Sequence, residues 1–142
     1  MSNLIINELS LRWTGELAFE AHTGSGHVVQ LDATVANGGQ NAGPQPVEML
    51  LVSLAGCAAM DVLAILKKQR QPVEGFKVSV HSERVSEHPR VCTAIHITYT
   101  IQGTGVQAEA VARAIHLTNT KYCPIHAMLA PTVPITDSYV IE

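Results

Sequence analysis

The stretch from Pro44 to Leu66 constrains the fold most, because no second apolar run of comparable length follows it. Gly43 and Pro44 break any preceding strand, and Pro46 is tolerated in a first helical turn, where its missing N–H is no loss. From Met49 onward almost every side chain is apolar or small, which leaves no wide polar face. A helix of this kind is either a core helix or a membrane span.

Two acidic residues interrupt this run, and the basic stretch 67–70 ends it. We therefore interpret it as the buried core helix of a soluble protein, and we expect no membrane partner. Its middle carries small side chains that would let another helix approach closely, namely Ser53, Ala55, Gly56, Ala58 and Ala59. One cysteine, Cys57, lies among them.

Composition limits the protein class. The chain has 142 residues, 46% of them hydrophobic, and a net charge of −3, which predicts one globular domain over residues 1–142. No basic stripe is present, so we expect no nucleic-acid partner. Three widely spaced cysteines do not form a disulfide scaffold, and residues 1–4 lack a signal-peptide pattern. Both observations favour the cytoplasm, where a cysteine pair is more often catalytic or metal-binding than structural.

The remaining periodicity predicts an α+β domain of order βββ-α-ββ-α-β. Strands are expected over 4–13, 17–22 and 28–36, and a Gly- and Pro-rich loop over 37–46 leads into the central helix. The helix should end near Pro72. A hairpin over 76–84 and 91–101, a second helix over 107–119, a short helical turn within 121–129 and a last strand over 133–141 should follow.

Three motifs occur together: Gly-Pro-x-Pro-x-Glu-x-Leu-Leu over 43–51, Leu-Ala-Gly-Cys ending at Cys57, and Lys-Tyr-Cys-Pro around Cys123. With these motifs the sequence resembles the OsmC/Ohr family, which comprises osmotically inducible protein C and the organic hydroperoxide resistance proteins. The continuation Asp-Val-x-x-Ile-Leu from Asp61 is similar to the OsmC-like branch. The resemblance covers nearly the whole chain, including the element order.

The resemblance implies a two-cysteine peroxidase for organic hydroperoxides, with Cys57 as the peroxidatic thiol and Cys123 as the resolving thiol. A thiolate attacks the O–O bond and becomes a sulfenic acid, and a second thiol converts it to a disulfide. An external dithiol restores the enzyme by exchange. No metal or organic cofactor is required, and the expected role is stress defence.

In the family an arginine, held by the glutamate that matches Glu48, stabilises the thiolate. The matching region 13–19 contains no arginine; Arg12 is the nearest, and Arg113 is a second candidate, although either could be an ordinary surface charge. Glu48 precedes Cys57 by nine residues, about 13 Å along a helix and roughly on its opposite side. A Glu48 that serves a given Cys57 would therefore come from a second chain, which agrees with the intertwined homodimer that the family adopts.

Simpler interpretations stay open. Cys57 could be a small buried hydrophobe and Glu48 only a favourable first-turn charge. Cys92 has no motif and is expected to pack inertly. Asp61 lies one turn beyond Cys57 on the same face, would oppose thiolate formation if close, and is expected to make a structural hydrogen bond. His126 follows Cys123 by three residues, but no fourth metal ligand is evident, so no metal is expected.

Two functions therefore remain. The first is reduction of organic hydroperoxides, preferentially apolar ones. The second is a protein that keeps the fold and the cysteine pair without efficient peroxidase chemistry, and that binds a small apolar or electrophilic ligand or acts as a redox sensor. A cation beside Cys57, with the two sulfur atoms close enough to bridge, would favour the first.

Overall fold

The computed structural model describes residues 3–142, which divide into two compact units. The first ends at Leu50 and the second runs from Leu51 to Glu142. We describe each unit by itself, so the single domain expected over residues 1–142 stays a prediction.

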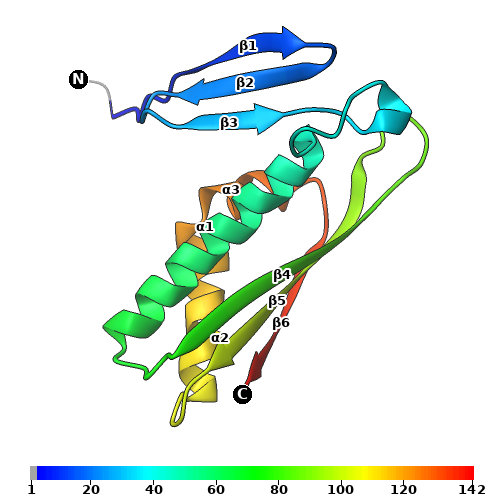
Figure 1. The fold of residues 1–142 in the computed structure, drawn as a ribbon. Helices are drawn as coiled ribbons and strands as arrows, with labels where there is room; N and C mark the ends of the chain where they lie inside the picture. The colour runs from blue at the N-terminus through cyan, green and yellow to red at the C-terminus, as the bar shows by residue number, and fades with distance from the viewer. Residues whose placement is uncertain (1–2) are drawn as a thin grey trace. The chain divides into compact units, whose positions relative to one another are not determined.

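The first unit is an antiparallel meander of three strands (Figure 1). These are β1 (Leu9–Gly15), β2 (Ala18–Thr23) and β3 (Val28–Leu31). The third strand was expected to reach Ala36 but ends at Leu31, because the chain turns at the buried Asp32. The Asp32 carboxylate accepts hydrogen bonds from the backbone N–H groups of Ala33, Gln40 and Ala42, and so shapes the loop that follows.

The long helix α1 (Pro46–Lys68) begins as the sequence predicts. Pro46 occupies its first turn, and the Gln45 N–H donates a 3.0 Å hydrogen bond to Glu48 Oε1. A glutamate in the first turn that reaches back to the preceding amide is a typical helix-start arrangement. By length and composition α1 could cross a membrane, a test that the core helix of a soluble protein also passes.

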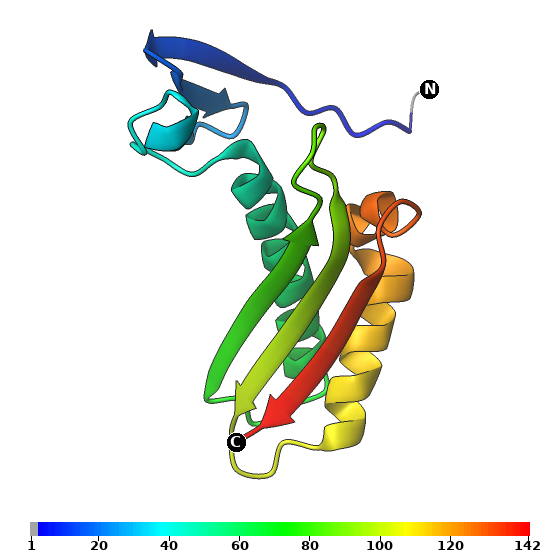
Figure 2. The same ribbon diagram turned by 90° about the vertical axis from the view of Figure 1, so that its right-hand side faces the viewer.

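The second unit packs helices on a three-stranded sheet. The sheet contains β4 (Gly75–Arg84), β5 (Cys92–Gln102) and β6 (Ile135–Ile141); β4 pairs antiparallel with β5, and β6 pairs parallel with it. Figure 2 shows α1 and α2 (Ala108–Leu117) behind one face of this sheet. A π-helical turn (Thr118–Tyr122) and the short helix α3 (Pro124–Leu129) connect α2 to β6. The expected element order is confirmed, with α3 where a helical turn was expected.

The core of this unit forms where the helices meet β5. Alternate residues of β5 are buried, and α1 contributes one stripe with a spacing of four residues: Leu54, Ala58, Val62 and Leu66. Composition predicts a helix buried on every side, but in the single chain only this stripe is buried, because a single layer packs against it. Val52 and Met60 stay 59% and 75% exposed, so much of the apolar surface of α1 has no cover within one chain.

Candidate functional site

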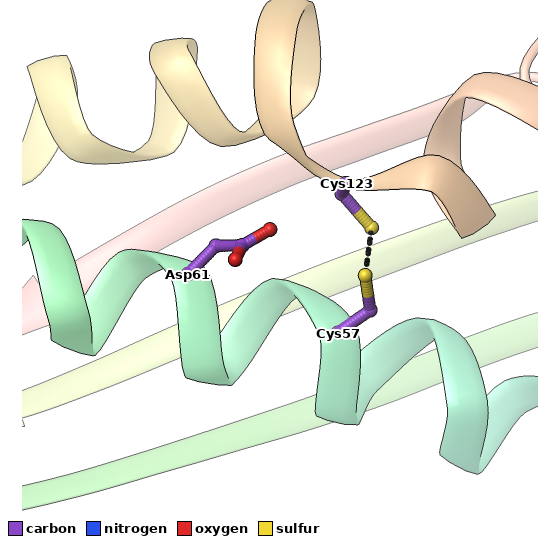
Figure 3. A group of neighbouring side chains, drawn as sticks. All are labelled: Cys57, Asp61 and Cys123. Carbon is purple, nitrogen blue, oxygen red and sulfur yellow. Dashed lines mark hydrogen bonds between the residues drawn. The ribbon is translucent and has the colours of Figure 1, made fainter. Parts of the chain in front are cut away.

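The second unit brings two of the three cysteines together. Cys57 lies in the middle of α1, and Cys123 immediately precedes α3. Their sulfur atoms are 2.8 Å apart and share a hydrogen bond (Figure 3). All three cysteines are free thiols. Because an S–S bond measures about 2.05 Å, a short movement of one side chain would suffice to close a disulfide.

Local backbone structure fixes the position of Cys123. Its N–H donates to the carbonyl of Thr118, the first residue of the π-helical turn, and Pro124 then starts α3. The Cys123 sulfur caps this helix, since it accepts a 3.3 Å hydrogen bond from the His126 backbone N–H. Cys123 is 3% exposed, so hydrogen bonds of its backbone and of its sulfur hold a buried residue in place.

A carboxylate completes the group. Asp61 lies one turn after Cys57 on α1, and Figure 3 shows its side chain on the same side of the helix as the two sulfur atoms. One ligand atom from each of Cys57, Asp61 and Cys123 lies within 4.8 Å of the others. Within residues 3–142 the buried Asp61 Oδ2 has no hydrogen-bond partner, so the structural hydrogen bond expected for Asp61 is not made at this atom.

These surroundings raise the pKa of the Cys57 thiol to about 11. Burial is the largest cause, followed by the hydrogen bond with Cys123. A backbone hydrogen bond from Ile125 acts in the opposite direction, whereas the charges of Cys123 and Asp61 raise the pKa further. Among the described residues, the groups that act on this thiol include no cation. The site therefore holds Cys57 as a neutral thiol at pH 7.

A buried phenol is influenced by the charges of the same group. Tyr99 comes from β5 and is fully buried, and within the described chain its hydroxyl has no hydrogen-bond partner. Burial raises the Tyr99 pKa well above its usual range, and the charges of Asp137, Cys123 and Asp61 add to the shift. Since Asp61 and Cys123 act on this hydroxyl, it belongs to the surroundings of the thiol pair.

A cavity of about 350 Å³ begins at Asp61 and continues between α1 and α2. Two of its lining residues, Lys68 and Arg113, carry a positive charge. The remaining lining residues include three aliphatic side chains; the complete set is Asp61, Ala64, Ile65, Lys68, Gln69, Arg113, Leu117 and Tyr122. Its volume is in the range of small-molecule sites.

Other residues singled out in the sequence lie elsewhere. Glu48 is in the first turn of α1, where its hydrogen bond to the Gln45 amide supports the simpler interpretation of a helix-start residue. Arg12 pairs with Glu20 across β1 and β2 at 2.8 Å. Arg113 lines the cavity but makes no ion pair with Asp61 within residues 3–142. Cys92 starts β5, half-buried against the core, as expected of an inert cysteine.

Sequence reasoning placed Asp61 near Cys57 but did not single out Tyr99. The Cys-x-x-x-Asp spacing did signal that Cys57 and Asp61 share a helix face, and Asp61 opposes ionisation of Cys57 as expected. Tyr99 gave no signal, because it occupies an ordinary inward position in an alternating strand.

The sequence matches a known protein family and a known bacterial protein. The profile described as "OsmC-like protein" matches residues 38–137. Protein YhfA of Escherichia coli K12 is 40% identical over 131 residues, which cover 92% of this chain and 95% of YhfA.

Solved structures agree on the fold. A hypothetical protein from Aquifex aeolicus VF5 is 31% identical, with a TM-score of 0.82 and coverage of 98% of this chain and 99% of that one. An organic hydroperoxide resistance protein OsmC from Legionella pneumophila has a TM-score of 0.70 at 13% identity, and the match covers 97% of this chain and 98% of that one. At that identity the likeness concerns the fold alone.

Proposed function

Because this chain belongs to the OsmC-like protein family, we propose that it is a two-cysteine peroxidase that reduces organic hydroperoxides. The observation that carries the proposal is the 2.8 Å distance between the sulfur atoms of Cys57 and Cys123. The substrate class is part of the proposal and follows the resemblance of the motifs around Cys57 and Cys123 to the OsmC/Ohr family.

The proposed cycle uses no cofactor. The Cys57 thiolate attacks an oxygen of the hydroperoxide, the O–O bond breaks, and the products are an alcohol and a Cys57 sulfenic acid. The Cys123 thiol then attacks the Cys57 sulfur, which releases water and forms the disulfide. An external dithiol reduces that disulfide by exchange. The short distance favours the second step, because Cys123 needs no rearrangement of α3 to reach Cys57.

The first step needs help that the single chain lacks. With a pKa of about 11, about one Cys57 in ten thousand is a thiolate at pH 7. We therefore propose that the working form is a homodimer in which a second copy brings Glu48 and a cation to each Cys57. The exposed apolar side chains of α1 support this proposal, since Leu50, Val52 and Met60 have no cover in one chain.

A second candidate function follows from the same pKa. A neutral Cys57 with the anionic Asp61 beside it suits slow oxidation, as in a redox sensor, or binding of a small electrophilic ligand. The cavity at Asp61 would hold such a ligand. A cytoplasmic location fits either candidate, because both require cysteines that are kept reduced.

Anaerobic thiol counting tests the peroxidase proposal. The reduced, chelator-treated protein is mixed with a small excess of cumene hydroperoxide, and in parallel with hydrogen peroxide. We expect fast loss of two thiols per chain, faster with the organic peroxide, because the surroundings of Cys57 are mainly apolar. Cys57→Ser should abolish the loss and Cys92→Ser should leave it intact. Thiols that survive for minutes would reject the peroxidase and favour the second candidate.

A further inference from the structure

The group formed by Cys57, Asp61 and Cys123 has the composition of a metal site. Two sulfur atoms and one carboxylate oxygen lie within 4.8 Å of one another (Figure 3). Cys57 and Asp61 come from one face of α1, four residues apart, and Cys123 comes from the turn before α3. Two separate elements thus bring three donor atoms to one point in the interior of the second unit.

Several buried polar atoms in the second unit have no hydrogen-bond partner among the described residues. Asp61 Oδ2 is buried without a hydrogen bond, and so is the hydroxyl of the fully buried Tyr99, within the part of the chain that the structure describes. Buried polar atoms are paired in nearly all proteins, and an exception calls for an ion, a water molecule or a functional role. A cation among the three donors would provide the missing partner of the Asp61 carboxylate.

We propose that Cys57, Asp61 and Cys123 bind a zinc ion. Thiolates select soft or borderline metals, and a set of two sulfurs and one oxygen suits zinc better than calcium or magnesium. Three protein ligands leave the fourth tetrahedral position to a water molecule or a small ligand.

One of the three donors, Asp61, also lines the cavity between α1 and α2. Two thiolates and one carboxylate around a divalent ion leave one negative charge in the interior. Lys68 and Arg113 line the cavity that Asp61 also lines.

Binding requires a small local adjustment. Zn–S bonds of about 2.3 Å in tetrahedral geometry set two sulfur atoms about 3.8 Å apart. The sulfur atoms are 2.8 Å apart, so they separate by about 1 Å when zinc binds. Each sulfur has a hydrogen bond from a backbone amide, that of Ile125 for Cys57 and that of His126 for Cys123, and side-chain rotation must accommodate the movement.

The sequence-based expectation of no metal rested on the absence of a fourth ligand beside Cys57, Cys123 and His126. The proposed ligand set differs from that one. The backbone N–H of His126 donates a hydrogen bond to the Cys123 sulfur, and Asp61 is the third proposed ligand beside the two cysteines. Neither element alone carries a metal motif, so only the folded chain brings the donors together.

Titration of the reduced full-length chain with Co²⁺ and Zn²⁺ under anaerobic conditions tests the proposal. We expect one ion per chain, the visible absorption bands of a tetrahedral cobalt thiolate, and displacement of cobalt by zinc. Cys57→Ser, Cys123→Ser and Asp61→Asn should each weaken zinc binding at least about tenfold. Cys92→Ser and Glu87→Gln, which change a cysteine and an exposed carboxylate outside the group, should bind as the wild type does.

Alkylation of the wild-type chain gives a second measurement that needs no variant to fold. Bound zinc should protect Cys57 and Cys123 from iodoacetamide but leave the accessibility of Cys92 unchanged. Absence of stoichiometric binding by the wild type would overturn the proposal, as would full affinity in Asp61→Asn or equal loss in Cys92→Ser. No peroxide enters these measurements, so their outcome is independent of the peroxidase proposal.

Discussion

The carboxylate of Asp61 faces the thiol of Cys57 one helical turn away, and its charge raises the pKa of that thiol. Both residues lie in α1, so the distance between them along the helix does not depend on how α1 packs against other elements. A peroxidatic cysteine needs the opposite environment, because a nearby cation or hydrogen-bond donors favour the thiolate. Asp61 thus adds to the burial that keeps Cys57 a neutral thiol in the single chain, and a cation that acts on Cys57 would make it a better nucleophile.

Asp61→Asn should make Cys57 more reactive in the reduced, metal-free chain. The substitution removes an anion that raises the pKa, but this is the smallest of the causes acting on Cys57. We therefore expect a gain of about threefold in the rate of iodoacetamide modification near pH 8, equal to about half a pKa unit. Mass spectrometry of the Cys57 peptide measures the rate. Glu87→Gln is the matched control, and an unchanged or lower rate in Asp61→Asn would contradict the electrostatic argument.

The reactivity of Cys57 should increase steeply with pH in the same metal-free protein. Only the thiolate reacts, and the Cys57 pKa is about 11. The rate should therefore rise about tenfold per unit from pH 7 to pH 10 and level off above the pKa. A stopped-flow or quenched alkylation series measures this profile. A plateau that begins near pH 7 in the isolated chain would mean that a group outside the described surroundings stabilises the thiolate.

Removal of the second thiol should change the fate of oxidised Cys57 rather than its first oxidation. Cys123→Ser removes the thiol that lies 2.8 Å from Cys57, so excess cumene hydroperoxide should carry Cys57 on to the sulfinic acid. In the wild type the 2.8 Å neighbour should divert it to the disulfide. Intact-protein mass spectrometry distinguishes the two products, with Cys92→Ser as the control. A disulfide in Cys123→Ser at the wild-type rate would show that Cys92 resolves instead.

Much of the fold was predictable because it follows local rules. Pro46, the apolar run and the closing basic stretch define α1, and alternation defines the hairpin of β4 and β5. The end of β3 was not predictable, since Asp32 stops the strand through hydrogen bonds to amides up to ten residues away. Periodicity describes which side chains face one way, but it contains no information on such contacts within a loop.

The candidate site was predictable only where a family motif marks it. The motifs around Cys57 and Cys123 led to the expectation of a close pair, and the sulfur atoms are close. The unpartnered oxygen of Asp61 and the buried hydroxyl of Tyr99 depend on how α1, α3 and β5 pack, which one sequence does not reveal. The raised pKa of Cys57 likewise results from burial in the folded chain.

Leu54→Ala should destabilise the protein strongly. Leu54 is fully buried in the stripe of α1 that faces β5, and loss of a buried leucine side chain leaves a cavity. We expect the free energy of unfolding to fall by about 2–5 kcal/mol. Val85→Ala, in which the side chain is already 41% exposed, should cost less than about 1 kcal/mol. Urea denaturation at one fixed protein concentration measures both, and equal losses would contradict the assignment of the core.

Met60→Lys should separate the proposed homodimer without unfolding the chain. Met60 lies on the surface of α1 opposite its buried stripe and is 75% exposed, so a lysine fits there in one chain at little cost. If that surface packs against a second copy, the lysine buries an unpaired charge among apolar side chains, which is strongly unfavourable. We expect wild-type dimers and variant monomers in light scattering, with equal circular dichroism. The exposed Val140→Lys on β6 is the matched control.

Met60→Lys should also lose the fast oxidation of Cys57, because a monomer lacks the Glu48 and cation of a second copy. A Met60→Lys protein that stays dimeric would place the interface elsewhere. A monomeric variant whose Cys57 is oxidised at the wild-type rate would show that groups of the same chain activate Cys57.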